Sequence, residues 1–362
     1  MRRGAATALL GLGFILVAAV FDAEPLYVPG VAFVVLAGSS VAWVWAGARG
    51  LRLTRTVGAH RVLEEQRVPI DVKVTAGRFT LPVGLIEDDL LPGPAPIAAR
   101  GRVTHVRIEA RFARRGTKRL SPPRVVVSDA FGLATRTVVG DQADELLVLP
   151  RIVPVTAPRG SGEGTGLAAR RARRSVAAEV DLDGLRPYRE GAPASRIFWP
   201  GVARGGEMME RRLRADGDTR PLVVLDPRGA RVEDDLDAAV RAAASLCVHL
   251  ARRGGCALLL PGDRRPTALE PALGGWAHLH VRLALVGADR APNTGGLATR
   301  RGPVLYVAAH VPSRPPRALA HAPGGGRLLI VPGRYGTLPP VFEVAGCRAY
   351  ELRGARRRTE VA

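Results

Sequence analysis

The chain has 362 residues, too many for one ordinary domain and enough for two cores and a smaller element. Its formal net charge is +20, which raises nucleic acid as a partner. However, Lys73 and Lys118 are its only lysines, and arginine carries almost all the charge. Abundant Arg, Ala, Gly and Pro are typical of GC-rich coding, so we interpret the charge as background with some attraction to membrane surfaces.

Residues 1–50 are predicted to form a transmembrane helical hairpin. Two uncharged apolar runs cover residues 5–21 and 26–48. The second is long enough to cross a bilayer of about 30 Å, and the first is at the short end. The few residues between them, including Asp22, Glu24 and Pro25, make a loop so short that it forces a hairpin.

Flanking arginines predict that both termini and the soluble domains are cytoplasmic, at the cell membrane. Arg2 and Arg3 precede the first run, and Arg49, Arg52 and Arg55 follow the second. The alternative is a cleaved signal peptide over residues 1–23, which leaves the second run unexplained. A reducing compartment also fits the cysteines, which form no CxxC pair and are predicted to be buried: Cys247, Cys256 and Cys347.

Residues 51–156 are predicted to form a β-sandwich domain. Apolar and polar residues alternate in runs at 68–76, 80–89, 102–112, 123–129 and 146–150, separated by Pro and Gly clusters. Residues 157–180 are Gly-rich and then Arg-rich. No GK[ST] follows those glycines, so we predict a flexible linker whose RRARR run is a solvated charge cluster.

Residues 221–362 are predicted to form a three-layer, Rossmann-like α/β domain with a parallel sheet. A buried strand ends at Asp226, and an amphipathic helix begins near Glu233 and stops before Gly254. Further strands are expected at 256–262, 303–310 and 326–333, with a helix at 271–287. On that helix His278 and His280 would point apart, which disfavours a metal site.

Residues 181–220 form an arginine- and aromatic-rich segment that joins the two domains. Guanidinium groups can stack on Tyr188 and Trp199 and pair with Glu190, so we predict an interdomain joint. A partner-docking surface is the second interpretation, and it can overlap with the joint. Catalysis is the third, but no nucleophile and base pair, GxSxG or HExxH motif accompanies the segment. Its candidate residues are Arg186, Tyr188, Arg189, Glu190, Gly191, Arg196, Trp199 and Arg204.

The order of these parts resembles the bacterial "domain of unknown function 58" family. The resemblance rests on a GxRxYxxG…RxIxW…AR signature, whose positions also include Gly184, Ile197 and Ala203, and on RRGTKRLSPPRVVVSDAFGL at 114–133. The chain departs from the family pattern at Ala192, Phe198 and Val202. The resemblance implies a C-terminal domain like von Willebrand factor A, and an association with MoxR-type AAA+ ATPases and other von Willebrand A proteins.

In metal-binding von Willebrand A domains, a strand ends in D-x-S-x-S, whose Asp and Ser oxygens help to bind Mg²⁺. Here residues 226–230 read Asp-Pro-Arg-Gly-Ala, so both serines are missing and Arg228 adds a positive charge. Hard cations need several oxygen ligands. We therefore interpret Asp226 as a degenerate metal position without a cofactor. It remains the best single candidate for a partner contact, since ligands gather at the carboxyl ends of such strands.

The sequence favours a membrane-anchored, non-enzymatic adaptor that presents its α/β domain to protein partners. The resemblance implies that it works in a MoxR-type ATPase-linked assembly or maturation system. Two alternatives stay open. One is an envelope-associated hydrolase that uses Glu190 and Asp226. The other is a membrane-tethered nucleic-acid binder, which the membrane position and the lack of any recognised binding module disfavour.

Overall fold

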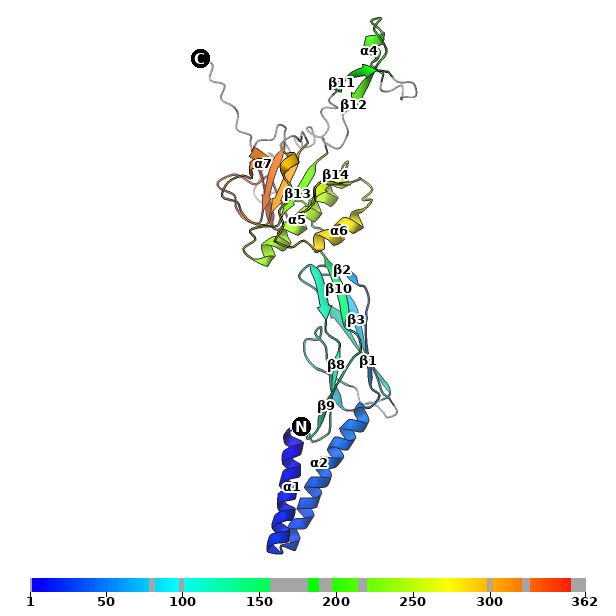
Figure 1. The fold of residues 1–362 in the computed structure, drawn as a ribbon, viewed down its shortest axis with the longest axis vertical. Coiled ribbons are helices and arrows are strands. Elements are labelled where there is room, and N and C mark those ends of the chain that lie inside the picture. The colour runs from blue at the N-terminus through cyan, green and yellow to red at the C-terminus, as the bar shows by residue number, and fades with distance from the viewer. Residues whose placement is uncertain are drawn as a thin grey trace. The chain divides into compact units, whose positions relative to one another are not determined.

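The computed structural model describes residues 2–77, 82–97, 101–156, 182–188, 197–213, 220–297, 300, 302–320 and 326–352. The chain divides into two compact units, Met1–Val148 and Leu149–Ala362 (Figure 1). Residues 149–156, placed with the β domain from sequence, belong to the second unit. There the Val153 N–H donates to Ser245 Oγ at 2.9 Å, and Thr156 bridges Glu343. The predicted linker 157–180 lies outside the described residues.

The first unit begins with an antiparallel pair of helices, α1 (Arg2–Phe21) and α2 (Tyr27–Ala48), joined by the short 3-10 helix η1 (Glu24–Leu26). Both helices are long and apolar enough to cross a membrane. Small residues let them approach closely, because a Cβ at Gly11 would lie 2.7 Å from the Gly30 carbonyl oxygen. Phe14 and Phe33 stack across the pair with ring centroids 6.1 Å apart. The predicted pair of apolar helices is thus present.

The rest of this unit consists of antiparallel strands in three sheets, ordered β1-β3-β6, β2-β10-β7 and β5-β4-β8-β9. The first and third sheets share one apolar core, to which Val44 and Ala48 of α2 also contribute. The long alternating strands were expected from sequence, whereas most of the short ones were not. The strands are β1 (Arg52–Val57), β2 (Arg61–Leu63), β3 (Val68–Thr75), β4 (Gly84–Glu87), β5 (Ala95–Pro96), β6 (Val103–Ala110), β7 (Gly116–Leu120), β8 (Arg124–Ser128), β9 (Thr135–Val139) and β10 (Asp144–Leu149).

A buried arginine connects all three sheets. Arg55 on β1 donates from Nε to Asp144 of β10 at 2.7 Å and from Nη1 to Asp88, just after β4, at 2.9 Å. Its guanidinium also donates to the carbonyl oxygens of Leu120 and Ser121, at the end of β7. The side chain has no exposed surface. Arg55, which the sequence places among the arginines that flank the second helix, is thus buried and paired inside the β domain.

The second unit contains a two-stranded sheet, a seven-stranded sheet and several helices. The two-stranded sheet pairs β11 (Leu182–Pro187) with β12 (Met209–Leu213), and the short helix α4 (Trp199–Val202) lies between them in the chain. The Phe198 N–H donates to the Met209 carbonyl oxygen at 2.8 Å, which ties the start of α4 to β12. The signature segment therefore has regular structure of its own.

The seven-stranded sheet has the order β15-β14-β13-β16-β17-β19-β18. Its four central strands are parallel, as predicted, but β15, β19 and β18 are antiparallel to their neighbours, so the sheet is mixed. The antiparallel edges were missed because these strands were not expected at all. The strands are β13 (Leu222–Asp226), β14 (Cys256–Leu259), β15 (Thr267–Leu269), β16 (Val304–Ala308), β17 (Arg327–Val331), β18 (Phe342–Val344) and β19 (Cys347–Glu351).

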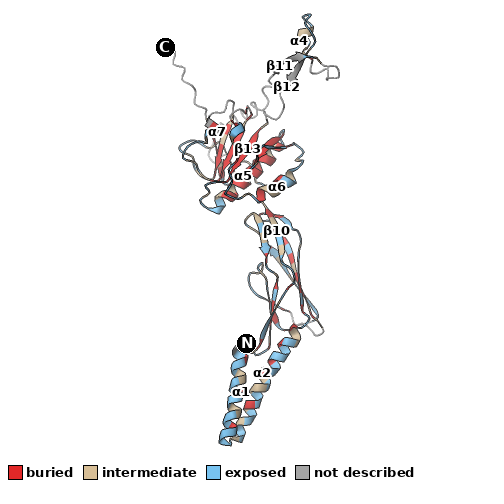
Figure 2. Ribbon diagram, in the orientation of Figure 1, coloured by how far each residue is buried: buried red, intermediate tan, exposed pale blue. Residues whose placement is uncertain are grey.

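Apolar clusters cover both faces of this sheet, and buried residues concentrate in β13 and α5 (Figure 2). One cluster packs α5 (Glu233–Ala251) and α6 (Trp276–Ala284) against Val223 and Leu225. The other packs Leu222 and Val224 against Leu319 of α7 (Arg317–Ala320) and Leu297 of the 3-10 helix η4 (Gly295–Leu297). The cysteines are buried and free, as expected: Cys247, Cys256 and Cys347.

Candidate functional site

The strand order places a topological switch point between β13 and β16. The chain leaves β13 through α5 to β14 on one side, and later returns to β16 on the other side of β13. In open α/β sheets, ligands bind outside the carboxyl ends of the strands at such a point. Asp226 is the last residue of β13 and pairs in register with Ala308, the last residue of β16. The candidate site is therefore the carboxyl end of these two strands.

The Asp226 carboxylate is buried and fully engaged. Its Oδ1 accepts hydrogen bonds from the backbone N–H of Arg228 at 3.2 Å and from Arg228 Nε at 3.0 Å. Its Oδ2 accepts from Arg228 Nη2 at 3.0 Å and from the Tyr306 hydroxyl at 2.6 Å. The side-by-side contacts of the guanidinium with both oxygens form a bidentate pair, the strong geometry for Arg and carboxylate. Asp226 is thereby held as an anion.

The electrostatics of the cluster follow from these contacts. Burial alone would raise the pKa of Asp226, but the hydrogen bonds from Arg228 and Tyr306 outweigh it and lower that pKa below its usual value. Burial and the neighbouring carboxylate raise the pKa of the Tyr306 hydroxyl, so it stays a neutral donor. The bond to Asp226 raises the pKa of Arg228. At neutral pH the cluster therefore holds one carboxylate and one guanidinium.

The turn after β13 holds the Arg228 backbone in place while its side chain reaches solvent. Gly229 has a φ of +70°, and a Cβ there would lie 2.9 Å from His310 Nδ1, so the position favours glycine. His310 Nδ1 lies 2.8 Å from the Arg228 carbonyl oxygen and donates to it when protonated at that nitrogen. The Arg228 side chain is 52% exposed, whereas that of Asp226 is 6% exposed. The outer surface of the cluster is therefore cationic.

These donors do not fit a divalent cation. Both oxygens of Asp226 already accept hydrogen bonds from Arg228, and Arg228 and Ala230 stand where the metal-binding pattern has serines. A cation would have to displace the guanidinium and would gain only one carboxylate, whereas hard cations take six or more oxygen ligands. Within the described residues, no group of three or more His, Cys, Asp or Glu side chains could hold a metal. The chemistry available here is the presentation of a fixed positive charge.

The signature residues that the structure describes lie on or directly after β11 and α4, whereas Asp226 lies on β13. Arg186 is on β11, opposite Glu210 of β12, and the backbone N–H of Tyr188 donates to the Met208 carbonyl oxygen at 2.9 Å. Trp199 is the first residue of α4 and is 55% exposed. Arg204 is also exposed. The remaining signature candidates lie outside the described residues: Arg189, Glu190, Gly191 and Arg196.

The two histidines on α6 point apart, as expected. His278 is exposed, whereas His280 is buried. His280 Nε2 lies 2.7 Å from the carbonyl oxygen of Pro150. The imidazole ring stacks on Trp276, with ring centroids 4.8 Å apart. Burial lowers the pKa of His280, so the ring is neutral and donates this bond. It holds the segment after β10 against α6.

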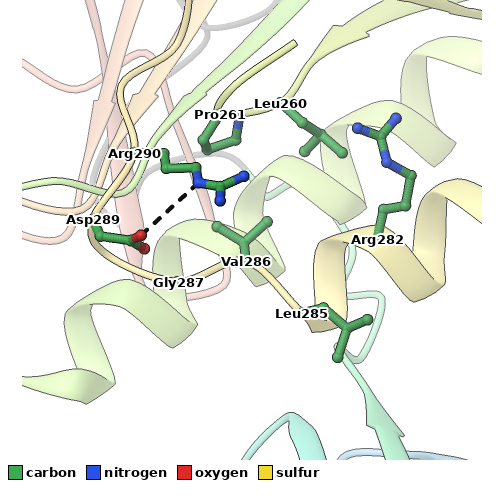
Figure 3. A pocket seen from close by; sticks show the side chains of 8 residues that line it. All are labelled: Leu260, Pro261, Arg282, Leu285, Val286, Gly287, Asp289 and Arg290. Carbon is green, nitrogen blue, oxygen red and sulfur yellow. Dashed lines mark ion pairs between the residues drawn. The ribbon is translucent and has the colours of Figure 1, made fainter.

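A pocket of about 380 Å³ lies beside the carboxyl end of β14 (Figure 3). Leu260 and Pro261 form one wall, Leu285 and Val286 after α6 form another, and Arg282 and Arg290 reach toward it from either side. Arg282 Nη2 donates to Asp263 Oδ1 at 2.6 Å, and Arg290 pairs loosely with Asp289 at 3.9 Å. Neither arginine is held by a bidentate contact with a buried carboxylate, so the pocket lacks the fixed guanidinium of the switch point.

Tyr306 and His310 were missed from the sequence. Tyr306 is the only residue of β16 with a polar side chain, and a hydroxyl in an otherwise apolar central strand is a usable signal, because a buried hydroxyl needs a partner. His310 follows the same strand directly, at the end where ligands gather. No known protein family matches the chain, and no curated protein was found to be similar to it.

Proposed function

We propose that the protein is a membrane-anchored, non-enzymatic adaptor that presents its α/β unit to an acidic surface on a protein partner. The carrying observation is the Asp226 and Arg228 pair. The buried Asp226 carboxylate accepts hydrogen bonds from Arg228 and Tyr306, so it is not accessible to a ligand. The Arg228 guanidinium that it holds is half exposed at the switch point. A guanidinium fixed in this way offers bidentate recognition to a carboxylate of the partner.

The anchor is the helical hairpin at residues 1–50. Large apolar side chains lie exposed along both helices, among them Leu9, Leu16, Val28 and Val35. Such a continuous apolar surface suits a lipid environment and would be a liability in water. Arg3 and Arg49 near the two ends of the pair favour a cytoplasmic location for both termini and for the soluble units. Membrane lipid is thus the first proposed partner.

The α/β unit is proposed to be like von Willebrand factor A, and the strands of the first unit a β-sandwich. The seven-stranded sheet supports the first part, since its doubly wound centre puts Asp226 where that fold carries its metal motif. The shared core of two sheets supports the second. Together with the signature motif, these features favour the "domain of unknown function 58" family and its implied partner, a MoxR-type AAA+ ATPase.

The proposed hydrolase role for Asp226 is less favoured. A general acid must hold a proton near neutral pH, whereas hydrogen bonds lower the pKa of Asp226. A nucleophile or base needs a free carboxylate oxygen facing the substrate, whereas both Asp226 oxygens face Arg228. Glu190, the other residue of that hypothesis, lies outside the described residues.

The test is binding of a purified MoxR-type ATPase by the full chain in lipid nanodiscs. Arg228→Gln removes the positive charge and keeps a donor for Asp226, so we expect about tenfold or greater weakening of binding. Arg231→Gln is the matched control, because Arg231 is an exposed arginine in the same loop. Equal binding by wild type and Arg228→Gln, or the absence of binding by either, would reject the proposal.

A further inference from the structure

The turn between β8 and β9 is built around one buried aspartate. Asp129 Oδ1 accepts from the backbone N–H of Ala134 at 2.7 Å, and Oδ2 accepts from that of Phe131 at 3.0 Å. Gly132 has a φ of +68°, and its N–H donates to the Asp129 carbonyl oxygen at 3.3 Å. Residues 129–134, the β8–β9 turn, therefore have a fixed shape that does not depend on the Phe131 side chain.

This turn is seated on the helical hairpin. The Gly4 N–H donates to the Leu133 carbonyl oxygen at 3.1 Å, and the Ser40 side chain of α2 lies beside Asp129 and helps to lower its pKa. Gly4 lies in the first turn of α1, where N–H groups lack a partner within the helix, so Leu133 supplies a cap. A Cβ at Gly4 would lie 2.6 Å from the Leu133 carbonyl oxygen, so this close contact between the turn and α1 requires glycine. The turn is thus held at the level of the α1 N-terminus.

Phe131 projects from this rigid turn and is 69% exposed. Trp43 and Trp45 are exposed on the last two turns of α2, near the end of the hairpin that contacts the turn. Arg49 lies over the Trp45 ring, 4.4 Å from its centroid. Ser40, which contacts the turn, lies eight residues before the end of α2, or about 12 Å along the helix. Trp and Tyr with nearby basic residues are typical of the membrane interface. The exposed phenyl ring lies at the same end of the hairpin.

We propose that the β8–β9 turn enters the interfacial layer of the bilayer, with Phe131 buried among lipid headgroups and upper acyl chains. The inference rests on the proposed membrane anchoring and adds a third lipid contact from the β domain. The lipid surface is the favoured occupant because the turn is hydrogen-bonded to Gly4 of α1, beside Arg3, and lies against Ser40 of α2. This contact would fix the depth and orientation of the first unit at the membrane.

The test measures the depth of a fluorescent label at position 131. The native cysteines are all buried, so Phe131→Cys in the full chain can be labelled selectively with an environment-sensitive dye. Leu63→Cys is the matched control, because Leu63 is also an exposed apolar residue, on β2. The proteins are reconstituted in vesicles of phosphatidylcholine with a minor fraction of phosphatidylglycerol. The vesicles carry nitroxide lipids labelled at the headgroup or deep in the chain.

We expect headgroup nitroxides to quench the label at 131 about twofold or more over that at 63, since interfacial side chains lie about 5–10 Å deep. Adding Gly4→Val should reduce the quenching at 131, because the new side chain displaces the turn. If the chain floats with the vesicles and the label at 131 is quenched no more than at 63, the turn is in water and only this inference fails. If the chain does not float, the anchoring proposal itself fails.

Discussion

Each unit holds an arginine bound to aspartate, but the two differ in exposure. In the first unit, the Arg55 side chain is fully buried and donates to two carboxylates and two carbonyl oxygens. In the second unit, Arg228 binds one carboxylate and leaves 52% of its side chain exposed. The same ion pair chemistry therefore serves a structural connection in one place and a surface charge in the other.

The number of hydrogen bonds around an arginine, together with its burial, indicates its role. A buried guanidinium must satisfy its donors inside the protein, because an unpaired buried charge is costly. The arrangement around Arg55 does so and connects three sheets. Among the described residues, the Arg228 guanidinium donates through Nε and Nη2 to Asp226, and the rest of it can meet a partner. Residue type and neighbouring aspartates alone do not separate these two cases.

The largest effect is expected for Arg55→Met. This change removes the centre of the network and leaves Asp88 and Asp144 without their cation, so unfolding of the first unit should become easier by about 3–5 kcal/mol. Chemical denaturation of the full chain in detergent, with hydrogen exchange of β3 and β6 amides, would measure it. A loss below about 1 kcal/mol would mean that the network contributes no more than an exposed pair.

A smaller effect is expected for Tyr306→Phe in the second unit. The hydroxyl donates to a charged acceptor at 2.6 Å in a buried site, so its loss should cost about 1.5–3 kcal/mol. Tyr350→Phe is the matched control, because its hydroxyl donates to the neutral Gly333 carbonyl at 3.2 Å and should cost only about 0.5–1.5 kcal/mol. Hydrogen exchange of β13 and β16 amides reports both. Equal costs would argue that the carboxylate at 226 is not charged.

The strands predicted from the sequence are those in which the pattern of apolar residues extends over enough positions to be recognised. β3 and β6 alternate over eight residues, and β13 is a continuous apolar run with both faces covered. β15 and β18 have three residues each and carry no period, so the mixed character of the sheet could not be predicted. The predicted helix at 271–287 begins only at Trp276, because Gly275 precedes it with a φ of +76°.

The site was predictable only in part. Asp226 follows from its place at the end of a buried strand, and Arg228 from its spacing of two residues. Tyr306 approaches from 80 residues away, and a single sequence contains no signal that pairs it with Asp226. Arg55 shows the converse limit. Its place just after an apolar helix resembled a membrane-flanking charge, and only the packing of three sheets reveals that it is buried.

Lowering the pH should reduce the unfolding free energy of the second unit by less than Tyr306→Phe does. The folded pKa of Asp226 is lowered, so its charge stabilises the unit above the unfolded pKa of about 3.9 and loses that contribution as pH falls through the folded pKa. Arg228 is half in solvent, which screens the attraction. The difference in unfolding free energy between wild type and Asp226→Asn should therefore stay constant from neutral pH to about pH 5 and narrow below about pH 4. A difference that widens in acid would contradict the assigned charge.

The smallest effect is expected for Arg67→Ala, which completes the comparison. Arg67 Nη1 lies 3.1 Å from Glu109 Oε2, yet the two side chains are 65% and 64% exposed. Water replaces this contact readily, so the unfolding free energy of the first unit should fall by only about 0–1 kcal/mol. The measurement is the same as for Arg55→Met, and added salt should make the difference smaller still. Arg55 and Arg67 lie in the same unit and have similar distances to their carboxylates, so only burial and bond number distinguish them. If Arg67→Ala were as costly as Arg55→Met, exposure would not separate structural from surface arginines, and the half-exposed Arg228 would lose its claim to be available for a partner.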